Sequence, residues 1–212
     1  MPSFLYADIG LTLGEYLLKE SPVYEESIGT DVADMKVGSP LIATNNVPQL
    51  VRVSTSANWA TRSADLHVYS VDTDGKKTAD HARCTIRFGN RNEWSKEFKR
   101  HAYLINHRID SLNRGVNGGQ SHKIKRSMAY KLFGAVVKYD EAYQGMEEVV
   151  FDNEMFEATA RVKSQTTESQ GKFNVGPYWI DSLGHIAGFI MNANDSTDPS
   201  IQVFINHGWD RL

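Results

Sequence analysis

Residues 177–192 read PYWIDSLGHIAGFIMN, and this stretch decides the fold of the chain. Pro177 suits the first turn of a helix, and apolar side chains occupy most of the helical circumference that follows. A helix that is apolar on nearly all sides is buried, so other elements must surround it. Gly184 and Gly188 lie four residues apart, which indicates close approach of another backbone to this helix.

A second stretch of the same kind lies near the start, where residues 5–18 read LYADIGLTLGEYLL. It predicts a buried helix over residues 6–19, ended by Glu20-Ser21-Pro22. Both stretches carry glycines at i and i+4 and an early aspartate, and strand-like sequence follows the first of them and returns after the second. The repeat predicts a duplicated unit in which an antiparallel sheet wraps a central helix. We therefore expect an α+β double hot dog, with two antiparallel sheets that each wrap a buried helix.

Alternating apolar residues and turn signals place the remaining elements. Strands are predicted over residues 48–56, 63–71, 78–88, 147–151, 155–164 and 201–205, with a hairpin turn at 72–75. Helices are predicted over residues 92–114 and 123–133, separated by a glycine-rich break at 114–119, and a polar loop over 166–172. The predicted organisation is a first hot dog half over 1–91, a basic helical linker over 92–143 and a second half over 144–212.

The amino-acid composition limits the classes of protein to which the chain can belong. The 212 residues are 41% apolar and 23% charged, near the average for a soluble globular protein, which excludes disorder or coiled coil for the whole chain. Cys84 is the only cysteine, so a disulfide framework and an all-thiolate metal site are excluded. With no bilayer-length apolar run and no secretory signal, we expect a cytoplasmic protein without a membrane segment.

The net charge of −3 conceals a basic middle. Between Lys99 and Lys138 nine basic residues stand against the single acid Asp110. This region could be a docking surface for an acidic protein, centred on Lys123, Lys125 and Arg126, or a solvated linker between the two halves. It lacks a recognisable nucleic-acid-binding module, and the overall charge is negative, so we expect no nucleic-acid partner.

Asp181 and His185 are the candidate chemical residues. Their i, i+4 spacing projects both side chains from one face of an otherwise apolar helix, where each must face a cavity or find a partner. A carboxylate so placed can fix the tautomer and orientation of a histidine that acts as a base. The alternative interpretation is a helix N-terminal acid beside a core histidine whose hydrogen bonds are satisfied.

The motifs Asp181-Ser-Leu-Gly-His185 and Asn206-His-Gly-Trp209, with YADIGLTLGEYLL at residues 6–18, resemble the product template domain of fungal non-reducing iterative polyketide synthases. The resemblance covers essentially the whole chain. It implies a dehydratase-like double hot dog that catalyses regioselective aldol cyclisation and aromatisation of a poly-β-ketone. It also implies that Asp181 is catalytic and that His185, Asn206 and Trp179 contact the substrate.

The resemblance has one departure. The family pairs its aspartate with a histidine in a Gly-His stretch just before the segment that resembles residues 2–8, and none of the seven histidines in this chain matches it. Family members also continue past Asn206-His-Gly-Trp209 with further strands. We therefore expect an internal fragment of a larger synthase, truncated at both ends and inactive in isolation.

The resemblance also implies partners. The substrate would be carried on the phosphopantetheine of an acyl carrier protein domain, so no cofactor or metal is expected in this chain. Other domains of the same synthase are the expected protein partners, with a homodimer in the full synthase. Two alternatives stay open: a β-hydroxyacyl dehydratase of the same fold, and a noncatalytic hot dog fragment.

Overall fold

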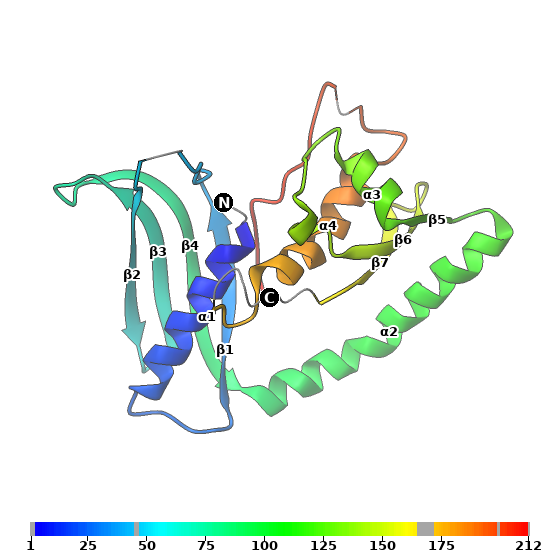
Figure 1. The fold of residues 1–212 in the computed structure, drawn as a ribbon. Coiled ribbons are helices and arrows are strands. Elements are labelled where there is room, and N and C mark those ends of the chain that lie inside the picture. The colour runs from blue at the N-terminus through cyan, green and yellow to red at the C-terminus, as the bar shows by residue number, and fades with distance from the viewer. Residues whose placement is uncertain (1–2, 45–46, 165–171, 199, 212) are drawn as a thin grey trace. The chain divides into compact units, whose positions relative to one another are not determined.

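The computed structural model describes residues 3–44, 47–164, 172–198 and 200–211. The chain divides into two compact units, one of Met1–Glu97 with His207–Leu212 and one of Phe98–Asn206 (Figure 1). The elements in chain order are α1 (Ser3–Lys19), β1 (Ile28–Val37), β2 (Leu50–Asn58), β3 (Ser63–Val71), β4 (Lys77–Asn90), α2 (Arg91–Gly118), β5 (His122–Lys125), α3 (Arg126–Phe133), the 3-10 helix η1 (Glu141–Tyr143), β6 (Met146–Asp152), β7 (Glu157–Val162), α4 (Pro177–Asn192) and β8 (Gly208–Trp209).

The first unit is an antiparallel sheet with a helix packed on it. Its strand order is β2-β3-β4-β1-β8, and α1 packs on β1, β3 and β4. Inward-facing residues of the strands, such as Val32, Leu66 and Ile86, form the core with Tyr6 and Leu18 of the helix. Buried residues alternate with more exposed ones along β3 and much of β4, so one face of the sheet is apolar there. The helix covers that face.

Glycines allow α1 to lie close to the sheet, as the sequence predicts. A Cβ on Gly14 would lie 2.3 Å from Cγ2 of Thr30 and 2.9 Å from Cγ2 of Ile86. The close neighbours are therefore side chains of β1 and β4 rather than another backbone. The helix is buried on the side that faces the sheet, whereas Tyr16 on the opposite side is 63% exposed, so the expectation of burial all round is wrong.

The strand β1 is absent from the sequence-based prediction. It lies between β4 and β8 in the sheet, and its polar residues hide the alternation. Asp31 forms an ion pair with Arg211 at 3.4 Å between Oδ2 and Nε, and Asp34 forms one with Arg87 at 2.6 Å. These partners are distant in sequence, so a local pattern does not reveal why carboxylates are tolerated in a strand that has a neighbour on each side.

The Asn206-His-Gly-Trp209 motif returns the chain to the first sheet. Trp209 in β8 pairs with Met35 of β1, and its indole N–H donates to the carbonyl of Val32 at 3.2 Å. Its ring stacks on Phe4 of α1 at 4.7 Å between centroids. The tryptophan of this motif therefore has a packing role in the first unit.

The second unit combines the antiparallel sheet β5-β6-β7 with the helices α3 and α4, which both pack on β6. Its core consists of Met146, Val149 and Phe151 of β6, Ala129 and Phe133 of α3, and Phe189 of α4, with further residues at its edge. The bounds of α4 coincide with the predicted 177–192. One side of α4 is exposed to solvent, because Leu183 and Met191 are each more than 40% exposed.

Three predicted boundaries are wrong. The expected break at 114–119 is helical as far as Gly118, and the first residues of the predicted helix 123–133 form the strand β5, whose Ile124 packs on the core. The strand β5 and the helix α3 are therefore parts of the second unit. Both lie within the segment 92–143, which was expected to be a linker. The predicted loop at 166–172 lies almost wholly outside the described residues.

The predicted strand 201–205 does not form. Instead, the side-chain amide of Asn192 donates to the carbonyl of Phe204 and accepts from its N–H, both at 2.8 Å. One side chain therefore supplies the two backbone hydrogen bonds that a neighbouring strand would give. Within the described ranges, no helix is long and apolar enough to cross a membrane.

Candidate functional site

Asp181 and His185 meet on the buried side of α4. The Nε2 atom of His185 lies 3.0 Å from Oδ2 of Asp181, and the two residues are 3% and 6% exposed. One helical turn separates them, which brings i and i+4 side chains together on one face. The structure thus joins the two residues that the sequence predicts to be partners.

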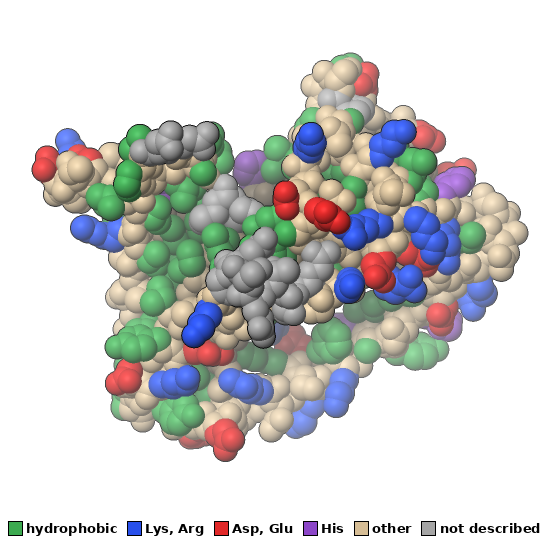
Figure 2. Space-filling view, in the orientation of Figure 1, with side chains coloured by type: hydrophobic (Ala, Val, Ile, Leu, Met, Phe, Trp, Pro, Cys, Tyr) green, Lys and Arg blue, Asp and Glu red, His purple; other side chains and the backbone are tan. Residues whose placement is uncertain are grey.

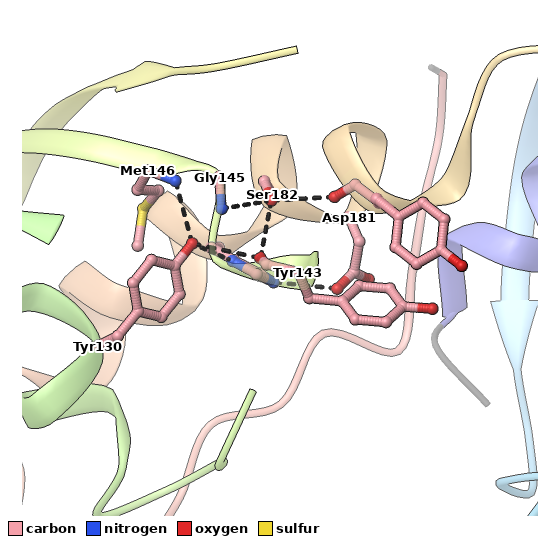
Figure 3. A network of polar contacts seen from close by, with 8 residues as sticks. Tyr130, Tyr143, Gly145, Met146, Asp181 and Ser182 are labelled. Carbon is pink, nitrogen blue, oxygen red and sulfur yellow. Dashed lines mark hydrogen bonds and ion pairs between the residues drawn. The ribbon is translucent and has the colours of Figure 1, made fainter. Parts of the chain in front are cut away.

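Tyr130 of α3 approaches the same imidazole from the other side. Its hydroxyl oxygen lies 3.0 Å from Nδ1 of His185 and accepts from the N–H of Met146, also at 3.0 Å. Figure 3 shows the contacts of this hydroxyl to the N–H of Met146 and to the carbonyl of Tyr143, the latter at 3.4 Å. Both ring nitrogens of His185 therefore have polar protein partners.

Aromatic rings enclose the imidazole. The ring of Tyr139 lies 4.0 Å from that of His185 between centroids, and Phe133 and Tyr130 lie edge-on to it at 5.8 Å. Phe133 and Tyr130 come from α3, whereas Tyr139 precedes η1. The cage keeps water away from the histidine and leaves it little freedom to rotate.

Ser182 anchors the chain segment that closes the site. Its hydroxyl is fully buried, accepts from the N–H of Gly145 at 3.1 Å and lies 2.9 Å from the carbonyls of Tyr143 and Tyr178 (Figure 3). A Cβ on Gly145 would lie 2.5 Å from this oxygen. The contact holds the end of η1 against α4, next to Asp181.

The tyrosines of the site stay protonated at neutral pH. Burial raises the pKa of Tyr130, and it raises the pKa of Tyr139 further, with the charge of Asp181 adding to the effect. Burial also raises the pKa of Tyr143 to about 12, with Tyr178 and Asp181 as the next causes. Each hydroxyl therefore retains its hydrogen and can act as a donor.

The other predicted site residues lie apart from this pair. Trp179 is half-buried in the first turn of α4, and its indole N–H donates to the carbonyl of Val175. Asn206 is exposed in the segment that follows α4. The structure brings Asp181 and His185 together and shows no such contact for Trp179 or Asn206 with either of them among the described residues.

Sequence reasoning missed Tyr130, Tyr139 and Ser182. Tyr139 and Tyr143 flank the aspartate that caps η1, and Tyr130 and Phe133 share one face of α3, so an aromatic cluster before β6 was the available signal. Its connection to α4 depends on tertiary packing, which no local spacing encodes.

In the described part of the chain, no group of three or more histidine, cysteine, aspartate or glutamate side chains could hold a metal ion. Burial, with the charge of Asp65 as a smaller cause, raises the pKa of the Cys84 thiol to about 12, so this thiol is a poor nucleophile. Asp181 and His185 remain the candidate chemical residues.

Comparison with known proteins shows similarity to polyketide synthases. A family model described as the polyketide synthase dehydratase N-terminal domain matches residues 115–207. The chain is 51% identical over 209 residues to a non-reducing polyketide synthase of Byssochlamys spectabilis, covering 99% of this chain and 10% of that protein. It is 48% identical over 212 residues to the conidial pigment polyketide synthase alb1 of Aspergillus fumigatus, covering 100% and 10%.

Over essentially its whole length, the chain is similar to a segment of fungal non-reducing polyketide synthases. It spans about a tenth of the length of these relatives. Among solved structures, the dehydratase domain from the CurF module of curacin polyketide synthase matches with a TM-score of 0.68 at 13% identity, covering 100% of this chain and 67% of that one. The dehydratase of the CurK module matches with a TM-score of 0.65 at 16% identity and similar coverage.

These matches confirm the predicted fold class and the predicted resemblance. The chain is α+β and has the double hot dog fold of synthase dehydratases. It is also similar to a fungal pigment synthase.

Proposed function

We propose that this segment acts as part of a product template domain, which cyclises a carrier-bound poly-β-ketone by regioselective aldol addition and aromatises the ring. The observation that carries the proposal is about 50% identity over the whole chain to non-reducing polyketide synthases, against 13–16% to dehydratases. In a synthase that does not reduce its ketones, the chain offers β-carbonyl groups. The β-hydroxyl that a dehydratase requires arises only after an aldol addition.

The chemistry needs a proton acceptor, an ordered chain and exclusion of water. A base removes a proton from a methylene between two carbonyls, and the enolate carbon bonds to a carbonyl carbon further along the chain. The carbonyl oxygen takes up a proton and later leaves as water, after which enolisation of the remaining ketones gives the aromatic ring. The resemblance assigns the base to a histidine that none of the seven histidines here matches, with Asp181 as its partner.

Asp181 is suited to exchange a proton with the oxygen that is lost. Its Oδ2 atom is held by His185 at 3.0 Å, and among the described residues Oδ1 has no hydrogen-bond partner. The carboxyl group is therefore fixed in orientation while one oxygen stays available. In this proposal Asp181 is the catalytic residue, because its free oxygen contacts the reacting chain.

His185, Trp179 and Asn206 are proposed to shape the substrate chamber. His185 has both ring nitrogens engaged within the protein, so it acts on the substrate through Asp181 and through the shape of its ring. The half-buried Trp179 supplies an apolar wall, and the exposed Asn206 supplies a polar one. Such walls restrict the conformers of a reactive polyketone that would otherwise cyclise in several registers.

An acyl carrier protein domain is the proposed partner that delivers the substrate. The basic residues first considered for docking are partly neutralised, because Lys123 and Lys125 both pair with Glu148, and Arg126 lies 3.7 Å from Glu141. Figure 2 shows blue and red side chains interspersed on the visible face of the second unit. Lys131 and Lys138 are exposed and have no ion pair among the described residues, which makes them the better docking candidates.

The second candidate function is a β-hydroxyacyl dehydratase, favoured by the dehydratase family match and by the fold. Product analysis of a complete synthase that contains this segment distinguishes the two functions. Mass spectrometry of products from malonyl-primed extension should show an aromatic ring released from the carrier. Conversion of a supplied β-hydroxyacyl thioester to an enoyl thioester, without cyclised product, would instead establish the dehydratase. The proposal also places the synthase in the cytoplasm.

A further inference from the structure

The imidazole of His185 lies between a carboxylate and a tyrosine hydroxyl. Its Nε2 atom faces Oδ2 of Asp181 and its Nδ1 atom faces the oxygen of Tyr130, each at 3.0 Å. A neutral imidazole carries one hydrogen, so one nitrogen donates and the other accepts. The neighbours decide which nitrogen carries the hydrogen.

An ionised Asp181 can only accept a hydrogen bond, so Nε2 must carry the hydrogen. Two bare lone pairs facing each other at 3.0 Å would repel in a buried site. Nδ1 of the neutral ring is then bare and needs a donor. Tyr130 is the only polar group that contacts Nδ1 in the described part of the chain, and burial keeps its hydroxyl protonated.

The hydrogen of Tyr130 has one competing acceptor, the carbonyl of Tyr143 at 3.4 Å. This contact is 0.4 Å longer than the one to His185, and the carbonyl lies 2.9 Å from the hydroxyl of Ser182, which can satisfy it. The N–H of Met146 meanwhile occupies a lone pair of the Tyr130 oxygen. The hydroxyl is thus oriented with its hydrogen toward Nδ1.

We infer that Tyr130 is a positioning residue that donates to the bare Nδ1 of the Nε2–H tautomer of His185 and so fixes the ring and, through it, the orientation of Asp181. With this hydroxyl removed, Nδ1 has no donor and the ring is held by Asp181 alone. The ring and the carboxylate bonded to it are then free to rotate together. Cages of aromatic rings exclude the water that could otherwise replace the missing donor. The catalytic consequence rests on the proposed function, whereas the tautomer does not.

The tautomer is measurable on the 212-residue chain itself. We would label the chain with ¹⁵N-histidine and record two-bond ¹H–¹⁵N correlations, assigning His185 by the signals lost in His185→Gln. The wild-type chain should show a protonated Nε2 and a bare, hydrogen-bonded Nδ1. Tyr130→Phe should shift the Nδ1 signal toward the value of a bare nitrogen without a hydrogen bond. Protonation of Nδ1 in the wild-type chain would overturn the inference even if the variant failed to fold.

Tyr139→Phe is the matched control. Tyr139 lies against the same imidazole with its ring, and its hydroxyl has no hydrogen bond to His185. Loss of this hydroxyl should leave the His185 signals in the wild-type pattern. Equal shifts in Tyr139→Phe and Tyr130→Phe would contradict a role specific to the Tyr130 hydroxyl.

A substitution of His185 separates positioning from a purely structural role. A glutamine amide has a covalently fixed donor and acceptor, so it can donate to Asp181 and accept from Tyr130 without a tautomer to choose. In a complete synthase, Tyr130→Phe should lower turnover roughly tenfold, the scale for partners that orient a functional histidine. In the His185→Gln background the same change should cost only two- to threefold. Equal losses in both backgrounds would contradict the inference. A shifted Nδ1 signal in Tyr130→Phe with unchanged cyclisation would contradict the proposed function alone.

Discussion

The side-chain amide of Asn192 hydrogen-bonds to both backbone groups of Phe204, at 2.8 Å from Nδ2 to the carbonyl oxygen and 2.8 Å from the N–H to Oδ1. It also donates to the carbonyl of Gly188, one turn earlier in α4. The residue is 7% exposed, so these bonds are largely shielded from water. The segment after α4 is therefore held to the second unit by one amide.

Replacement of Asn192 by leucine should destabilise the chain by about 1–3 kcal/mol, because a buried N–H and carbonyl lose their partners while side-chain volume is kept. Urea unfolding of the 212-residue chain measures the effect. Asn192→Asp should also destabilise the chain, because its carboxylate can accept from the N–H of Phe204 but would place its second oxygen against the carbonyls of Phe204 and Gly188. A leucine variant as stable as wild type would show that the amide is dispensable.

Gly14→Ala should lower the free energy of unfolding by about 1–3 kcal/mol, the usual range for overpacking. Alanine favours a helix by about 1 kcal/mol over glycine, so a packing clash must outweigh that gain. The new Cβ would lie 2.3 Å from Cγ2 of Thr30. Thr30→Ser removes this methyl group and should restore part of the loss, whereas a stabilising Gly14→Ala would refute the close approach of α1 to β1.

Glu148 should stabilise the fold in a pH-dependent way. Hydrogen bonds from Lys125 and then Lys123 lower the pKa of its carboxyl from 4.5 to about 2. A lowered pKa means that the stabilisation is present above pH 4.5 and is lost as the pH falls toward 2. The difference in unfolding free energy between wild type and Glu148→Gln should therefore be constant near neutral pH. It should disappear as the pH falls toward 2.

The exposed Glu154 in the next turn has no ion pair among the described residues, which makes Glu154→Gln the control. Chemical denaturation of the three proteins between pH 7 and pH 2 provides the comparison. If the unfolding free energy of Glu148→Gln has the same pH dependence as that of the wild type, Lys123 and Lys125 do not stabilise the ionised carboxylate of Glu148.

The helix α4 could be predicted to its terminal residues, because Pro177, a dense apolar pattern and the Asp181–His185 spacing all act within one element. The strand β1 could not, since Asp31 and Asp34 break its alternation and find their cationic partners far away in sequence. The segment 201–205 has the composition of a strand, but the amide of Asn192 occupies the backbone groups that a strand would pair.

In the candidate site, too, local sequence predicts some residues and tertiary packing is needed to find the others. Its carboxylate and histidine lie one turn apart and were found from spacing, whereas Tyr130 reaches them from a different helix. Only packing of α3 and α4 against β6 brings the three together. Residues that tune a functional pair from a neighbouring element therefore need the tertiary structure to be identified.

The exposed cations of the second unit should set affinity for the carrier domain. Charge reversal at Lys131 and Lys138 in a complete synthase should raise KM for a separately supplied carrier-bound substrate, with little change in kcat and with a steeper effect at low salt. The paired Lys123 provides the comparison, because Glu148 already compensates its charge. Unchanged KM at low ionic strength would exclude docking at these lysines.

The central claim is that Asp181 takes part in cyclisation, and the most direct test is product analysis of a complete synthase with Asp181→Asn. Asparagine keeps the size of the side chain and removes its capacity to exchange a proton. We expect enzymatic formation of the aromatic product to fall by about 10²- to 10⁴-fold, the range for loss of a general acid or base, with carrier loading unchanged. The exposed Asp110→Asn should behave as wild type. Near wild-type yield of the same aromatic product from Asp181→Asn would contradict the account.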